Sequence, residues 1–216
     1  MGSIYMPVTT PRQKIEQVRM FGKEYIDIVL VGDTFDAANS AAIEYAKKSG
    51  KTFIPPFDDQ KIIEGQGTIG YEILSQMPNV PDYVFVPIGG GGLASGVGAY
   101  IKTLSPETKI IGVEPAGAPC MKVAIEKGEV VELEEINKFI DGAAVKKAGK
   151  LTYEICKEVL DDIITVPEGA VCTSIINLYN KSAIVVEPAG ALSIAALKFY
   201  KDKIKGKNVV CIVSGS

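Results

Sequence analysis

The chain has 216 residues, enough for one ordinary α/β domain or for one domain and part of another. Its 47% hydrophobic and 23% charged residues are typical of a folded globular protein and argue against a disordered or low-complexity chain. With 26 acidic against 23 basic residues and only two arginines, it offers no basic stripe for nucleic acid. It contains no histidine, which excludes imidazole bases and every zinc site that needs a histidine ligand.

Short apolar runs alternate with stretches of helical periodicity along the whole chain. A helix is expected from about Pro11, and others around residues 35–46, 93–101, 171–178 and 192–199. A further short strand is expected after the helix around residues 35–46. The main predicted strands are residues 26–31, 83–88, 110–113, 163–166 and 209–213. This alternation predicts an α/β fold, an open parallel sheet with helices on both faces.

The segment Pro55-Pro56-Phe57-Asp58-Asp59 interrupts the alternation, because consecutive prolines remove hydrogen-bond donors and disfavour helix in the preceding residue. We interpret it as a boundary between a small unit, residues 1–57, and a larger one, residues 58–216. Cys120, Cys156, Cys172 and Cys211 form no C-x-x-C pair and are expected to be buried, reduced thiols. Together with the absence of an apolar run of 18 residues, they predict a soluble cytoplasmic protein without a membrane partner.

Four consecutive glycines, Gly89 to Gly92, follow a predicted strand and precede a predicted helix. Their N–H groups and the positive end of the helix dipole would cradle a phosphate. The alternative is a tight turn in which glycine only relieves steric strain. No Gly-Lys-Ser/Thr follows, so the loop is not a Walker A motif. Two interpretations of the phosphate remain open. A dinucleotide is one, since Gly89, Gly91 and Ala94 fit G-x-G-x-x-G/A and Glu114 ends the next strand. A cofactor with a single phosphate, such as pyridoxal phosphate, is the other.

Seven segments of the chain form a recognisable ordered set. They are Met6-Pro7-Val8-Thr9-Thr10-Pro11, Gly65-Gln66-Gly67-Thr68, Gly89-Gly90-Gly91-Gly92-Leu93, Gly112-Val113-Glu114-Pro115, Asp141-Gly142-Ala143-Ala144-Val145, Val186-Glu187-Pro188-Ala189-Gly190-Ala191 and Ser214-Gly215. In this order and spacing, they resemble the threonine dehydratase and serine racemase branch of the fold type II pyridoxal-phosphate enzymes. The resemblance covers nearly all of residues 4–215 and implies a tryptophan synthase β-like, three-layer fold.

By resemblance, the cofactor is pyridoxal 5'-phosphate, and the backbone N–H groups of Gly89, Gly90, Gly91, Gly92 and Leu93 would hold its phosphate. Ser214 would bond the pyridine nitrogen and Glu187 would lie near the ring. By spacing alone, Ser214 reads as part of a frayed tail and Glu187 as an acid at a helix start. Residues 141–142 would form a loop beside the cofactor or a simple turn, and residues 65–68 a helix near the site entrance or a helix interruption.

Two family motifs have no match in this chain: the Ser-x-Lys-x-Arg-Gly segment that carries the Schiff-base lysine, and a Ser-x-Gly-Asn loop. The chain therefore reads as an incomplete, N-terminally truncated form of the family fold, with no catalytic residue of its own. The family's divalent-cation site would use Glu114, but Cys120 stands where its second acid would be, so we predict no metal and a structural Glu114.

The resemblance implies a parent lyase that eliminates water from threonine or serine, giving 2-oxobutanoate and ammonia from threonine, as in isoleucine biosynthesis. The isolated chain is expected to be inactive, because it has no matched lysine. Two other functions remain open: a phosphate- or cofactor-binding module without catalysis, and a dinucleotide-binding oxidoreductase. The expected partner is a small amino-acid substrate. An exposed sheet edge and exposed apolar surface would also let copies of the chain associate.

Overall fold

A computed structural model describes residues 1–215, which form two compact units that divide after Ile54. The division falls three residues before the boundary expected at residues 57/58, so the whole Pro55–Asp59 segment belongs to the second unit. Whether the first unit is the remnant of a small domain stays a prediction. No helix within residues 1–215 is long and apolar enough to cross a membrane.

The first unit contains two parallel strands, β1 (Gly2–Met6) and β2 (Ile26–Leu30), joined by helix α1 (Arg12–Gly22) and the 3-10 turn Lys23–Tyr25. Helix α2 (Phe35–Ser49) follows, capped by Thr34, whose side chain accepts the N–H of Ala37 at 3.2 Å. The sequence did not predict β1, and the short strand expected after α2 was wrong, because the chain there runs without regular structure.

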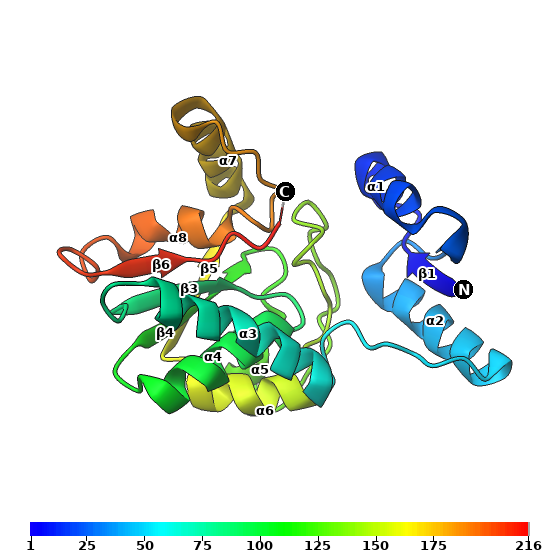
Figure 1. The fold of residues 1–216 in the computed structure, drawn as a ribbon, viewed down its shortest axis with the longest axis horizontal. Helices are drawn as coiled ribbons and strands as arrows, with labels where there is room; N and C mark the ends of the chain where they lie inside the picture. The colour runs from blue at the N-terminus through cyan, green and yellow to red at the C-terminus, as the bar shows by residue number, and fades with distance from the viewer. Residues whose placement is uncertain (216) are drawn as a thin grey trace. The chain divides into compact units, whose positions relative to one another are not determined.

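The second unit is built on a four-stranded sheet in the order β5-β4-β3-β6, in which every neighbouring pair is parallel (Figure 1). Strand β3 lies between β4 and β6, and its residues Val84, Phe85 and Val86 are fully buried, as the uninterrupted apolar run predicted. The strands are β3 (Tyr83–Pro87), β4 (Lys109–Pro115), β5 (Asp162–Val166) and β6 (Val209–Cys211).

Helices cover both faces of this sheet, which confirms the predicted α/β class (Figure 1). On one face, α8 packs on β3, β4 and β5, where the ring of Tyr200 meets Phe85 edge-on at 5.4 Å between centroids. On the other face lie α3, α4, α5 and α6. The helices are α3 (Gln60–Gln76), α4 (Gly92–Leu104), α5 (Cys120–Lys127), α6 (Lys150–Val159), α7 (Glu168–Ser182) and α8 (Leu192–Tyr200).

Helices α3 and α4 pack unusually closely. A Cβ on Gly96 would meet the carbonyl oxygen of Ile63 and lie 2.6 Å from the backbone nitrogen of Gly67, so only glycine permits this approach. Helix α3 runs without a break through residues 65–68, and the alternative of a helix interruption there was wrong. The close packing brings the first turns of α3 beside the glycine loop that precedes α4.

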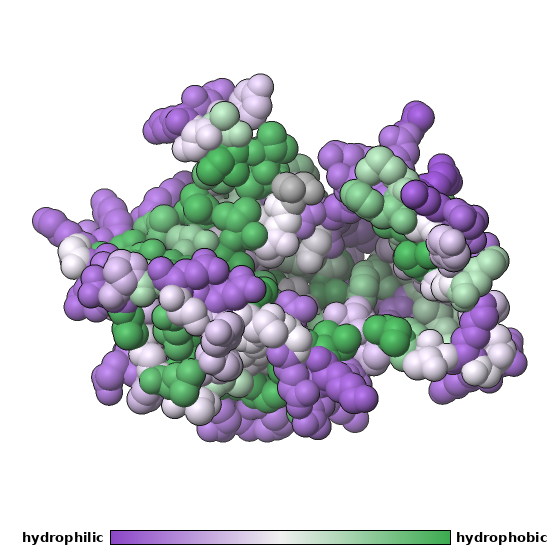
Figure 2. All heavy atoms as spheres, viewed as in Figure 1, coloured by the Kyte–Doolittle hydropathy of each residue, from purple (hydrophilic) through white to green (hydrophobic). Residues whose placement is uncertain are grey.

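Apolar side chains remain exposed on and after α7, where Figure 2 shows hydrophobic surface in green. An exposed apolar surface of this kind is compatible with association of copies of the chain, which stays a prediction. The residues concerned are Ile176, Tyr179, Ile184 and Val185.

Candidate functional site

A cavity of about 560 Å³ opens in the second unit at the carboxyl ends of β3 and β6. Ligand sites in parallel sheets lie at this end of the strands. All seven residues that the sequence assigned to cofactor binding line this one cavity: Gly89, Gly90, Gly91, Gly92, Leu93, Glu187 and Ser214. Their convergence is an observation of the structure, whereas the role of each residue stays a prediction.

The glycine loop forms one wall of the cavity and leads directly into α4, whose N-cap is Gly91. Gly91 has φ of +97°, a conformation that side chains disfavour. Within residues 1–215, the backbone N–H groups of residues 89–93 donate no hydrogen bond to another protein group. Unpaired N–H groups at the positive end of a helix favour an anion, so this wall has the donors that a phosphate needs.

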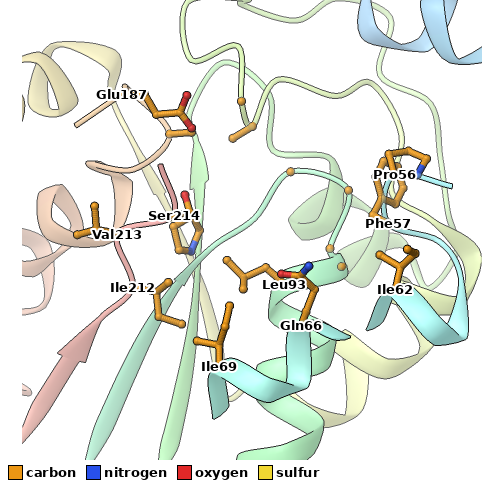
Figure 3. Close-up of a pocket in the computed structure, with 18 residues that line it drawn as sticks. Pro56, Phe57, Ile62, Gln66, Ile69, Leu93, Glu187, Ile212, Val213 and Ser214 are labelled. Carbon is orange, nitrogen blue, oxygen red and sulfur yellow. The ribbon is translucent and has the colours of Figure 1, made fainter. Parts of the chain in front are cut away.

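Phe57 covers part of this loop, with its ring where a Cβ on Gly90 would lie and its Cβ 2.9 Å from the position of one on Gly92 (Figure 3). A Cβ on Gly91 would likewise lie 2.6 Å from Met121 and 3.0 Å from Thr152. The tight-turn interpretation therefore accounts for part of the glycine requirement, because protein groups already fill the space next to these residues. It does not account for the unpaired N–H groups.

Ser214 and Glu187 lie across the cavity from Phe57 (Figure 3). The chain around Ser214 is held on both sides: the hydroxyl of Ser193 donates to the carbonyl of Ile212 at 2.7 Å, and the N–H of Glu187 donates to that of Gly215 at 3.2 Å. The segment is thus anchored, contrary to the frayed-tail alternative.

The Glu187 carboxylate lies against Gly215 and beside Gly142, where a Cβ on Gly142 would be 3.2 Å from Oε1. Its backbone carbonyl accepts the N–H of Ala191 at 3.1 Å, just before α8. The side chain therefore sits beside the cavity-lining glycine of the Asp141-Gly142 loop, and this loop is part of the site rather than a distant turn.

Glu114 is fully buried and caps α5, because its two carboxylate oxygens accept the N–H groups of Met121 and Lys122, each at 2.8 Å. Burial raises the pKa of Glu114 to about 7, although these two hydrogen bonds oppose the increase. A carboxylate held in this way is not free to bind a ribose, so the structure removes the acid that the dinucleotide interpretation required. No cluster of three or more carboxylate and thiol side chains in residues 1–215 could hold a metal ion.

Among the cavity residues that the sequence did not assign to the site are Pro56, Phe57, Ile62 and Ile69. The first two belong to the segment interpreted as a boundary, and the other two lie on α3. The Pro-Pro-Phe-Asp-Asp run contained a usable signal, an aromatic residue placed between a rigid turn and helix-capping acids. Cys120 and Cys156 are buried as predicted, whereas Cys172 and Cys211 are only partly buried; all four are free thiols.

The sequence profile of the family described as "Pyridoxal-phosphate dependent enzyme" matches residues 2–215. The chain belongs to this family. Its cofactor is pyridoxal 5'-phosphate and not a dinucleotide. The dinucleotide oxidoreductase alternative was therefore wrong.

Relatives within the family include biosynthetic L-threonine dehydratases. The enzyme of Halalkalibacterium halodurans is 60% identical over 214 residues, which are 99% of this chain and 52% of the relative. That of Bacillus subtilis is 57% identical over 214 residues, 99% of this chain and 51% of the relative. The chain thus spans about half the length of these curated relatives.

Solved structures of the family have the same fold. The processed form of threonine deaminase isoform 2 from Solanum lycopersicum superposes with a TM-score of 0.89 at 42% identity, over 99% of this chain and 62% of that one. Maize serine racemase superposes with a TM-score of 0.88 at 29% identity, over 99% of this chain and 65% of that one. These likenesses confirm the fold type II architecture expected from the sequence.

Proposed function

We propose that this chain is the cofactor-binding part of a dehydratase that eliminates water from threonine. The unsaturated amine that results then takes up one water and releases ammonia, so the net products are 2-oxobutanoate and ammonia. The relatives named biosynthetic threonine dehydratase support this substrate, with serine as the next candidate. The observation that carries the proposal is the row of unpaired N–H groups at residues 89–93, which line a cavity at the carboxyl ends of the strands.

In this proposal, the cofactor's phosphate binds the N–H groups of Gly89, Gly90, Gly91, Gly92 and Leu93. The residues fit this group, because an anion satisfies donors that the protein leaves unpaired, and the helix dipole of α4 adds favourable charge. Phe57 covers one side of the loop and keeps water from it, which strengthens the hydrogen bonds to the phosphate.

Ser214 is proposed to bond the ring nitrogen of the cofactor. A hydroxyl is neutral, so it leaves that nitrogen largely unprotonated and moderates electron withdrawal by the ring. Glu187 lies on the same side of the cavity as Ser214 and beside the loop that contains Gly142, and from there its side chain would orient the ring. When bound, the cofactor supplies an electron-withdrawing ring that stabilises negative charge at the Cα atom of an attached amino acid.

Attachment of an amino acid begins from a lysine, and no lysine is among the described residues that line the cavity. We therefore propose that the 216-residue chain by itself binds the cofactor without turning over threonine. The alternative is a module that binds phosphate esters and belongs to no catalytic cycle; the unpaired donors alone would support it equally. The free thiols fit a reducing compartment, and we propose the cytoplasm.

Two ligands that differ by one phosphate test the proposal. Equilibrium dialysis of the chain against pyridoxal 5'-phosphate should show saturable binding that inorganic phosphate competes away, and pyridoxal without its phosphate should bind far more weakly. Equal affinity for the two ligands, or no affinity for either, would contradict a phosphate cradle. Incubation of the purified chain with threonine and cofactor should give no 2-oxobutanoate above the protein-free rate.

A further inference from the structure

The carbonyl groups of the glycine loop are held from behind by side chains of α5 and α6. The Cys120 thiol donates to the carbonyl of Gly89 at 3.5 Å, the Thr152 hydroxyl to that of Gly90 at 2.7 Å, and the Cys156 thiol to that of Gly91 at 3.8 Å. A peptide plane whose carbonyl is fixed on one side presents its N–H on the other. These contacts therefore determine which way the loop's N–H groups face.

Among these three contacts, that of Thr152 is the strongest. A hydroxyl at 2.7 Å makes an ordinary hydrogen bond, whereas a thiol is a weak donor. Burial raises the pKa of the Cys156 thiol to about 12, so this side chain stays protonated and contributes only a weak bond. Thr152 is fully buried, and the N–H of Gly149 adds a second, longer bond to the same carbonyl at 3.3 Å.

The direction of the Thr152 hydrogen bond differs from that of other helical threonines in this protein. The hydroxyls of Thr103 and Thr173 bond carbonyls one turn earlier in their own helices, those of Ala99 and Gly169, each at 2.8 Å. The Thr152 hydroxyl bonds a residue 62 positions away in the chain. Thr152 is the third residue of α6, so no residue of its own helix lies one turn earlier, and its hydroxyl bonds the loop.

The position of Thr152 is fixed in turn by Asp58. The Asp58 carboxylate accepts the N–H groups of Lys150 at 3.0 Å, Leu151 at 2.9 Å and Thr152 at 3.1 Å, which are the first three residues of α6. Its neighbour Asp59 caps α3 in the same way, through the N–H groups of Lys61 and Ile62. Asp58 therefore connects the chain before α3 to the helix that supports the loop.

We propose that Thr152, held by the Asp58 cap, is a positioning residue that orients the N–H groups of the glycine loop toward the phosphate of the cofactor. This inference rests on the proposed function, because it assigns a support to the same phosphate site. Thr152 lies behind the loop and touches its carbonyl side, so it acts through the loop and not on the ligand.

The test compares Thr152→Val, which removes the hydroxyl at nearly constant volume, with Thr152→Ser, which keeps the hydroxyl and loses a methyl group. Thr173→Val is the matched control, since it removes an exposed hydroxyl that bonds only its own helix. The loop in Thr152→Val spends less time in the binding orientation, so affinity for pyridoxal 5'-phosphate should fall roughly three- to tenfold, the range for one neutral hydrogen bond. Thr152→Ser and Thr173→Val should bind within twofold of the unmodified chain.

A second measurement needs no ligand. In ¹H–¹⁵N spectra, the amide signals of Gly90 and Gly91 should shift or broaden in Thr152→Val and return toward their original positions in Thr152→Ser. Unchanged signals in Thr152→Val would overturn the positioning role, whatever the ligand affinity. Signals that change in Thr152→Val and recover in Thr152→Ser, in a chain that binds no phosphate ester, would support the positioning role and refute the proposed function. Equal loss of affinity in both Thr152 variants would point to packing alone and overturn the inference.

Discussion

Replacing Glu114 by glutamine tests whether a buried carboxyl makes this protein less stable as the pH rises. Burial raises the pKa of Glu114 from 4.5 to about 7 in the folded protein. In the unfolded chain the carboxyl is exposed and regains its ordinary pKa. Between the two values, the folded state therefore binds a proton that the unfolded state has lost, and the free energy of unfolding falls as the pH increases.

The size of this effect follows from the difference between the two pKa values. At about 1.4 kcal/mol for each pKa step, a difference of about 2.5 corresponds to about 3 kcal/mol. The contribution is fully present below pH 4.5 and is lost as the pH rises through 7; about 2.5 kcal/mol of it is lost between pH 5 and 8. With a urea dependence of about 2 kcal/mol per molar, the midpoint of unfolding should move by about 1 M over that range.

Urea unfolding followed by far-UV circular dichroism at pH 5, 6, 7 and 8 measures this slope. The unfolding free energy of the unmodified chain minus that of Glu114→Gln should fall by about 2.5 kcal/mol from pH 5 to pH 8, because the variant has no proton to lose at this position. Glu126→Gln, on the exposed face of α5, the helix that Glu114 caps, should keep the slope of the unmodified chain. Parallel slopes for the unmodified chain and Glu114→Gln would refute the reasoning.

Three further experiments test contacts described above. Gly96→Ala should destabilise the protein by roughly 2–4 kcal/mol, because its Cβ would meet the backbone of α3. Gly65→Ala has no atom within 4 Å of its Cβ and should stabilise the protein by about 0.5–1 kcal/mol. Thermal unfolding compares the two variants, and equal midpoints would contradict the close helix packing. Asp58→Ala removes the cap of α6 and should cost about 1 kcal/mol by urea unfolding, an effect that Asp58→Asn should largely restore; an unchanged midpoint in Asp58→Ala would argue that water replaces the cap. Ser214→Ala should weaken pyridoxal 5'-phosphate binding by roughly three- to tenfold in equilibrium dialysis without changing the affinity for inorganic phosphate, and a parallel loss for both ligands would place Ser214 at the phosphate instead.

The central sheet could be predicted because its strands are buried on both faces and therefore read as continuous apolar runs. Val84, Phe85 and Val86 carry that signal within one short segment. In strand β1 that signal is reduced to the three residues 4–6, because Gly2 and Ser3 have low strand preference and pair with Ile26 and Asp27, far along the chain. A strand that depends on its neighbour for stability leaves little trace in local sequence.

The candidate site, like the sheet, could be predicted only where its sequence signal is local. The glycine loop could be predicted, because four adjacent glycines before a helix are a local feature with a direct physical meaning. The roles of Phe57, Asp58 and Thr152 could not, since each depends on a contact with a residue more than 30 positions away. The sequence showed an aromatic residue, an acid and a hydroxyl, but not the loop and the helix that they support.

The Asp58 cap also has a consequence for the order of folding. Its hydrogen bond to Leu151 closes a chain segment of 93 residues, which contains β3, α4, β4 and α5, so it forms only after much of the conformational entropy of the second unit has been lost. We expect the β3-α4-β4 pairing to be established while the glycine loop still lacks its support from α6. A phosphate ligand would then recognise only the finished fold, raising the barrier to unfolding without accelerating folding.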